Sequence, residues 1–151
     1  MIRTSGRDEA ETHFQVQRAA SLAGLAHIYP PDEHPYPDDV IRAQWREKQG
    51  AVLVAERDGR VVGVVVVHAC WLTNLYVLPE WWGSGVAGEL HDAALAAMPD
   101  CAEVKLWVLE ENRRARRFYE KHGWRPNGEE RVVEFPPHPL DVGYSFVREE
   151  P

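Results

Sequence analysis

One stretch of the chain combines glycine, serine and apolar residues in an order suited to binding an anion. It runs Leu75-Tyr-Val-Leu-Pro-Glu-Trp-Trp-Gly-Ser-Gly-Val-Ala-Gly88, which predicts a strand, a glycine-containing turn and then a helix. Glycine lets the backbone approach a ligand closely, and the first N–H groups of a helix have no partner inside it. These donors and the helix dipole together form a site suited to pyrophosphate.

Three ligands could use such a turn. A P-loop requires Gly-Lys-Ser/Thr at its end to reach the terminal phosphates and magnesium, whereas this turn reads Gly85-Val-Ala. The run Gly83-Ser-Gly-Val-Ala-Gly88 matches the spacing of a dinucleotide-binding turn, but it follows an antiparallel run of three strands and does not open an early βαβ unit. Coenzyme A is the third candidate. The residues of this turn alone leave the last two open.

A second informative run begins about 30 residues after the turn. It reads Asn112-Arg-Arg-Ala-Arg-Arg-Phe-Tyr119-Glu-Lys-His-Gly-Trp124. Together the two runs resemble the GCN5-related N-acetyltransferases. The phosphate-binding signature of that family is Gln/Arg-x-x-Gly-x-Gly/Ala, and its second hallmark is Asn-x-x-Ala-x-x-Phe-Tyr-x-x-x-Gly-Phe.

The resemblance is strong from about Val52 to Arg125 and extends over the first fifty residues only in the order of elements. It departs plainly from the phosphate-binding signature at Trp82, which stands where the signature has Gln or Arg. A side-chain contact expected near the phosphates is therefore missing. Since the anion site consists mainly of backbone N–H groups, we expect coenzyme A binding to survive this change.

The resemblance implies that the chain is an enzyme, an acyltransferase with acetyl-CoA as its cofactor. It implies transfer of an acetyl group to a primary amine of a small molecule or peptide, by direct attack in a ternary complex without a metal. A non-catalytic acyl-CoA-binding regulatory module is the alternative function. Homodimers are common in the family, so a homodimer is a further expectation, although no sequence feature indicates one.

The resemblance also implies which residues contact the cofactor. Those on the strand, the turn and the two helices are Leu75, Tyr76, Val77, Trp82, Gly83, Ser84, Gly85, Val86, Ala87, Gly88, Asn112, Ala115, Arg116, Phe118 and Tyr119. Asn112 is expected to cap its helix, to bind the cofactor, or both. We further expect one or two of the arginines at positions 113, 114, 116 and 117 to meet the 3′-phosphate.

Two catalytic roles follow from the same resemblance. In the family this strand splays from the next one, and one backbone N–H on it, here assigned to Val77, faces the thioester oxygen; such a donor is typically worth about 3 kcal/mol. Tyr119 matches the family tyrosine that protonates, or donates a hydrogen bond to, the departing thiolate. Full proton transfer from tyrosine to a thiolate is uphill by roughly 2 kcal/mol. Hydrogen bonding therefore matters as much as transfer.

The general base and the acceptor site are less defined. Related enzymes often have a carboxylate on the strand before the phosphate turn, but here those positions read Trp71-Leu-Thr-Asn74. The alternatives left open for the base are His68, Glu134, His138 and a water chain. The Tyr29–Pro37 loop and the Arg131–His138 turn are expected to hold the acceptor, with Tyr29, His34, Tyr36 and Trp71 as candidate contacts.

A single mixed α/β (α+β) domain over residues 1–151 must position these residues. Apolar periodicity and turn signals predict helices at Asp8–His27, Asp38–Lys48, from the Gly83–Gly85 turn to Met98, and at Asn112–His122. They predict strands at Ala51–Arg57, Arg60–His68, Ala69–Leu78 and Glu103–Leu109, near Trp124, at Arg131–Phe135 and at Val142–Arg148, with Asp58-Gly59 as a hairpin turn. The expected order is ααβββαβαββ, with a mostly antiparallel sheet flanked by helices and a helical crossover in the middle.

Composition excludes several other classes. The net charge of −7 argues against a general nucleic-acid binder, and no apolar run approaches the roughly 20 residues needed to cross a bilayer. Seven histidines without metal-ligand spacing predict no metal site. Cys70 and Cys101 are expected to be small buried residues in a reducing compartment. With no signal-like apolar stretch at the N-terminus, we expect a cytoplasmic protein.

Overall fold

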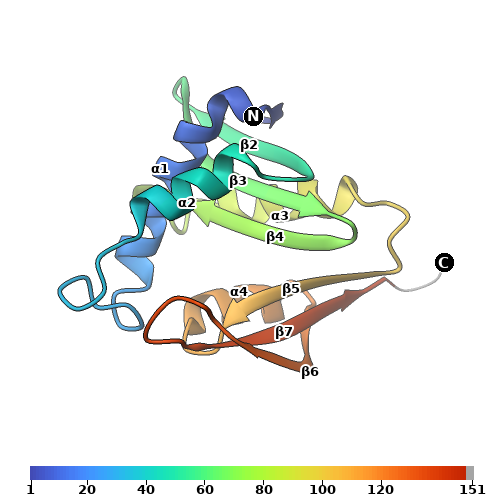
Figure 1. Cartoon of the computed structure of the whole chain (residues 1–151). Helices are drawn as coiled ribbons and strands as arrows, with labels where there is room; N and C mark the ends of the chain where they lie inside the picture. Colours follow the sequence, from blue (N-terminus) through green and yellow to red (C-terminus); the bar gives the residue numbers. More distant parts are fainter. Residues whose placement is uncertain (149–151) are drawn as a thin grey trace.

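The computed structural model describes residues 1–148 and shows a seven-stranded mixed sheet with four α-helices (Figure 1). The strand order across the sheet is β1-β2-β3-β4-β5-β7-β6. In chain order the elements are β1 (Ile2–Ser5), α1 (Ala10–Gly24), α2 (Asp38–Arg46), β2 (Ala51–Arg57), β3 (Arg60–His68), β4 (Trp71–Val77), α3 (Val86–Ala96), β5 (Glu103–Leu109), α4 (Arg113–Lys121), β6 (Arg125–Val132) and β7 (Leu140–Val147), with short 3₁₀ turns at Arg7–Glu9 and Pro79–Trp81. The predicted mixed, mostly antiparallel sheet flanked by helices is confirmed.

The hairpin between β2 and β3 forms at the predicted turn. Asp58 and Gly59 both have positive φ angles, 54° and 76°, which is the geometry that joins two twisted strands through two residues. β3 then pairs antiparallel with β4, and α3 carries the chain across to β5, which runs parallel to β4. The predicted helical crossover is therefore present.

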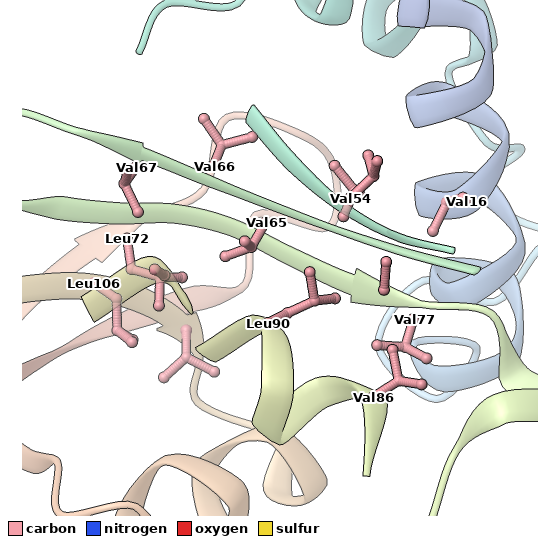
Figure 2. Close-up of a cluster of buried hydrophobic side chains, with 14 of the residues drawn as sticks. Val16, Val54, Val65, Val66, Val67, Leu72, Val77, Val86, Leu90 and Leu106 are labelled. Carbon is pink, nitrogen blue, oxygen red and sulfur yellow. The ribbon is translucent and has the colours of Figure 1, made fainter. Parts of the chain in front are cut away.

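Helices cover both faces of the sheet, with α1 and α2 on one side and α3 and α4 on the other (Figure 1). The core against α3 is built from valines and leucines of β3, β4 and β5, such as Val65 and Leu72 (Figure 2). Gly63 allows this packing, because a Cβ there would lie 2.7 Å from a methyl carbon of Leu90. Any larger residue at position 63 would push α3 away from the sheet.

The two central strands, β4 and β5, diverge soon after they begin. β4 and β5 share a single pair of partners, Trp71 and Lys105, supported by a hydrogen bond from the Lys105 N–H to the Cys70 carbonyl at 3.1 Å. Beyond this point the strands diverge (Figure 1). The β4 edge that faces β5 is therefore left without strand partners over most of its length. The predicted backbone donor, the N–H of Val77, belongs to this strand.

The element order departs from the prediction at both ends. A strand, β1, precedes the first helix and pairs antiparallel with β2, whereas the predicted order begins with a helix. The strands predicted near Trp124 and at Arg131–Phe135 are one strand, β6, interrupted by an irregularity between Pro126 and Glu130. The last strand begins at Leu140 and not at Val142.

The prediction for the cysteines is wrong. Cys70 and Cys101 are half-buried and form a disulfide, with their Cα atoms 5.7 Å apart. Cys70 lies in the β3–β4 turn and Cys101 immediately precedes β5, so the pairing of β4 with β5 brings them together. The cysteines therefore give no support to the expectation of a reducing compartment.

Residues 1–148 contain neither a membrane-spanning helix nor a cluster of metal-binding side chains. No helix in this part of the chain has both the length and the hydropathy required to span a membrane. Nor do three or more histidine, cysteine or acidic side chains gather anywhere in it in a way that could hold a metal ion.

Candidate active site

The opening between β4 and β5 exposes a backbone donor at Val77. Hydrogen bonds alternate in direction along an antiparallel strand, and the N–H of Leu78 donates to the Val62 carbonyl of β3 at 2.9 Å. The N–H of Val77 therefore points the other way, toward the side from which β5 has diverged. Val77 is also buried, with 6% of its surface exposed, so this donor lies in a water-poor environment.

The glycine turn lies directly beyond this strand. Gly83 and Gly85 have φ angles of 78° and 94°, a backbone conformation that other residues rarely adopt, and Gly85 immediately precedes the first residue of α3. The N–H groups of Gly83, Gly85 and Ala87 have no acceptor within residues 1–148. All three residues line a cavity of about 250 Å³. The turn therefore presents free donors at a helix N-terminus, as the anion-site prediction requires.

Helix α4 forms another wall of the same cavity. Asn112 caps this helix, because its side-chain oxygen accepts a hydrogen bond from the Ala115 N–H at 3.2 Å. Asn112, Ala115, Phe118 and Tyr119 all line the cavity, together with Leu75, Tyr76 and Val77 of β4. The two sequence runs that carry the resemblance thus face each other across one cavity, although they lie about 30 residues apart in the chain.

Tyr119 lies where two cavities meet. It lines the cavity at the glycine turn and also a larger one, of about 540 Å³, that follows the face of β4 and β5. Tyr119 is only 8% exposed, and its hydroxyl makes no hydrogen bond with the described residues. Burial raises the pKa of Tyr119 above its usual value of 10.0. The hydroxyl therefore keeps its proton at neutral pH and is free to donate it in a hydrogen bond.

Trp82, the departure from the family signature, has a structural role. Its indole N–H donates to the Val77 carbonyl at 2.8 Å, which ties the turn to the end of β4. The guanidinium carbon of Arg114 lies 3.5 Å from the centre of the Trp82 ring, a cation–π contact. Arg114 lines the cavity with the glycine turn and forms no ion pair within residues 1–148. A cation from α4 thus lies beside the position where the family places Gln or Arg.

Four of the predicted cofactor residues do not line this cavity. The Ser84 hydroxyl donates to the Trp81 carbonyl at 2.5 Å, and Val86 is buried in the core. A Cβ added at Gly88 of α3 would lie 3.7 Å from the His122 ring nitrogen Nε2. The guanidinium of Arg116 is engaged elsewhere, since it donates to the Tyr144 hydroxyl and to the Glu110 carbonyl, both at 2.9 Å. Among the four arginines of this helix, Arg114 is the one that reaches the cavity.

Most of the predicted acceptor residues line two neighbouring cavities. Tyr29, His34 and Tyr36 line a cavity of about 430 Å³ between the loop after α1 and the β6–β7 loop, and Trp71 lines the one that also contains Tyr119. In Figure 1 these two loops lie at the same end of the molecule. The remaining candidates do not line any of these cavities. These are His68, Glu134 and His138, all of them exposed.

Sequence reasoning missed one buried charge in this region. Asp141 of β7 lines both acceptor-side cavities and is 7% exposed. The predicted last strand starts at Val142, so position 141 lies outside every predicted element. Placing position 141 inside the strand would have put it on the same face as Gly143 and Ser145, opposite the apolar face of Val142 and Tyr144.

Comparison with known proteins agrees with this geometry. The model of the Acetyltransferase (GNAT) family matches residues 8–124. Among curated proteins, an uncharacterized N-acetyltransferase from Mycobacterium tuberculosis is 38% identical over 85 residues, which are 52% of this chain and 54% of that protein. The chain thus spans about half the length of this curated relative.

Solved structures share the fold. Apo YjaB from Escherichia coli superposes with a TM-score of 0.81 at 22% identity, covering 99% of this chain and 98% of that one. The PaiA N-acetyltransferase of Thermoplasma acidophilum, solved in complex with coenzyme A, gives a TM-score of 0.76 at 22% identity and covers 98% of each chain. Members of the matched family use acetyl-CoA as cofactor. The splayed strands, the glycine turn and the family match together establish that this chain belongs to the Acetyltransferase (GNAT) family.

Proposed function

We propose that the protein is an N-acetyltransferase that transfers the acetyl group of acetyl-CoA to a primary amine by direct attack in a ternary complex. One observation carries the proposal. The free N–H groups of the glycine turn and the residues Val77 and Tyr119 all belong to one cavity, which adjoins the acceptor-side cavities. Binding, oxyanion stabilisation and leaving-group stabilisation thus have their donors within a single site.

The turn fits a coenzyme A diphosphate. A Cβ added at Gly83 or Gly85 would meet no atom within 4 Å, so the space above the free N–H groups is open to a ligand. The donors carry no acceptor from the protein, and unpaired N–H groups at a helix N-terminus favour an anion. Arg114 adds a positive charge beside them. Neutralising two phosphate charges requires such a set of donors.

The protein groups near the reacting centre act on developing charge. Acetyl-CoA, when bound, supplies an acetyl thioester and a thiolate leaving group. In this proposal the Val77 N–H donates to the carbonyl oxygen as negative charge develops there, an effect typically worth about 3 kcal/mol. The Tyr119 hydroxyl donates to the departing sulfur. Because burial raises the pKa of Tyr119, it acts by hydrogen bonding and full proton transfer is disfavoured.

Removal of the amine proton falls to water in this proposal. His68, Glu134 and His138, the side chains considered for this role, do not line any of the three cavities. A lysine-like amine of pKa about 10.4 costs roughly 4.6 kcal/mol to deprotonate at pH 7. We therefore expect the rate to rise with pH above neutrality for alkylamine acceptors.

Turnover in an amine panel tests the proposal against its alternative. Purified protein is mixed with acetyl-CoA and individual primary amines, and thiol release is followed with time, with Tyr119→Phe as the catalytic control. Amine-dependent thiol release that falls in the variant supports the enzyme. Tight coenzyme A binding with no turnover on any amine would instead indicate a regulatory acyl-CoA-binding module.

A further inference from the structure

Asp141 is a buried carboxylate at the mouth of the splayed strands. It lies on β7 between two neighbours, paired with Leu109 of β5 on one side and with Arg131 of β6 on the other. The residue is 7% exposed and lines both acceptor-side cavities. A carboxylate this deeply buried requires strong partners, because the charge loses most of its water.

The partners visible in the protein satisfy only half of this carboxylate. Its Oδ2 accepts a hydrogen bond from the Arg131 Nε at 2.9 Å. Its Oδ1 accepts none within residues 1–148. The Arg131 guanidinium is also engaged with Trp107, 4.6 Å from the ring centre, and the arginine side chain stays 55% exposed. One oxygen of a nearly buried carboxylate is therefore free for a ligand.

The cavity around this oxygen suits a cation on an apolar stem. In the 430 Å³ cavity the acidic residues are Glu33 and Asp141, and its lining contains no lysine or arginine. The rings of Tyr29, Tyr36, Tyr76 and Phe135 form much of the wall, and aromatic faces attract cations. Burial, and then the Asp141 charge, raise the pKa of Tyr29 to about 12. The Asp141 charge thus reaches the Tyr29 side chain in the wall of this cavity.

We propose that Asp141 binds a positively charged group of the acceptor, so that the acceptor is a diamine-like molecule carrying a second cation besides its reacting amine. This inference rests on the proposed function for the reacting amine. The 540 Å³ cavity is lined by both Tyr119 and Asp141. Arg131, the ion-pair partner of Asp141, also lies in its wall. An elongated acceptor can therefore place one amine near Tyr119 and leave its other end at Asp141. The two ends have opposite requirements, because the reacting amine must lose a proton while the bound ammonium keeps it.

Two amines of equal length test the inference. 1,5-Diaminopentane and hexylamine have the same number of heavy atoms, and only the former carries a second cation. We expect kcat/KM for the diamine to exceed that for hexylamine at least tenfold. In Asp141→Asn the KM for the diamine rises tenfold or more with kcat within about threefold, while the values for hexylamine stay unchanged. Equal kcat/KM for the two amines in the wild-type protein, or an unchanged KM for the diamine in the variant, overturns the inference.

A matched variant separates binding from structure. Arg131→Gln breaks the same ion pair but keeps the carboxylate, so the diamine preference persists or increases. If Asp141→Asn and Arg131→Gln weaken both amines alike, the aspartate has only a structural role and the inference is wrong. Glu129→Gln, which breaks the surface pair with Lys105, controls for the loss of an ion pair as such. Thermal unfolding of each variant verifies folding.

A binding measurement keeps the inference distinct from the proposed function. Calorimetric titration of 1,5-diaminopentane without acetyl-CoA requires no turnover. We expect a Kd that rises at least tenfold in Asp141→Asn and not in Arg131→Gln. If no amine is acetylated yet this difference appears, the proposed function fails and the cation site stands. If amines are acetylated without it, the cation site fails alone.

Discussion

Replacing Tyr119 by phenylalanine removes one hydroxyl from the junction of two cavities and leaves the ring in place. The ring packs against Phe118 and Trp124, with centroid distances of 5.3 and 5.7 Å. Because the hydroxyl has no hydrogen-bond partner within residues 1–148, its loss leaves no protein group unsatisfied. We expect the free energy of unfolding to change by less than about 1 kcal/mol. A change in rate can then be attributed to chemistry.

The expected rate effect follows from the charge on the leaving group. A hydrogen bond to a charged group contributes about 1.5 to 3 kcal/mol. Since about 1.4 kcal/mol corresponds to a factor of ten in rate, kcat should fall about 10- to 150-fold in Tyr119→Phe. The KM for acetyl-CoA should change by less than about threefold, because the donors of the glycine turn are untouched.

The assay is thiol release at saturating acetyl-CoA and amine, with a matched tyrosine as control. Tyr144 is fully buried, lines none of the three cavities and accepts a hydrogen bond from Arg116 at 2.9 Å. Tyr144→Phe should therefore lose some stability and keep its kcat. A kcat of Tyr119→Phe within twofold of the wild-type value would refute the role given to Tyr119.

Three further predictions concern donor binding and stability. Arg114→Gln should raise the Kd for coenzyme A about tenfold in calorimetry, because it removes a charge-assisted contact. Arg117→Gln, a change outside the cavity, should leave the Kd within twofold of the wild-type value. Equal effects of the two changes would contradict the role given to Arg114. Replacing Cys70 and Cys101 with serine should lower the free energy of unfolding by about 3 to 4 kcal/mol, because the disulfide joins residues separated by 31 positions. A wild-type Tm that does not respond to dithiothreitol would argue against this disulfide. Burial lowers the pKa of His91 below 6.5, so below pH 6.5 the unfolded state binds more protons than the folded state and the free energy of unfolding decreases. Urea unfolding at pH 8 and 5.5 should show this decrease, and it should be smaller in His91→Gln. A free energy of unfolding that does not change with pH would disprove the prediction.

Local signals in the sequence were sufficient for the parts of the fold that position the site. The Asp58-Gly59 turn, the glycine turn and the Asn112 cap are each specified by residues adjacent in the chain, because each depends on backbone conformation or on a neighbouring N–H. The strand Glu103–Leu109 appears with the predicted bounds, since polar and apolar residues alternate at its start and a short apolar run follows. These elements bring the predicted turn and Tyr119 to one cavity.

The features that were missed depend on contacts between distant segments. β1 has only four residues and is stabilised by pairing with β2, some fifty residues later, which no local pattern reveals. The disulfide likewise exists because parallel pairing of Trp71 with Lys105 brings the two cysteines together. A period or propensity read along the chain contains neither piece of information.

Side-chain direction is the other limit. Four arginines in five positions of one helix have the same charge, and only the packing of α4 determines that Arg114 stacks on Trp82 while Arg116 turns toward Tyr144. Asp141 was missed because the predicted last strand starts at Val142, which leaves position 141 outside the strand and therefore without an assigned face.

Calorimetric titration with coenzyme A, alongside NAD, tests most directly whether the free N–H groups of the glycine turn form a coenzyme A site. We predict saturable one-site binding of coenzyme A, weakened in Arg114→Gln, and no measurable heat with NAD. An absence of coenzyme A binding, or equal affinity for the two ligands, would contradict the account.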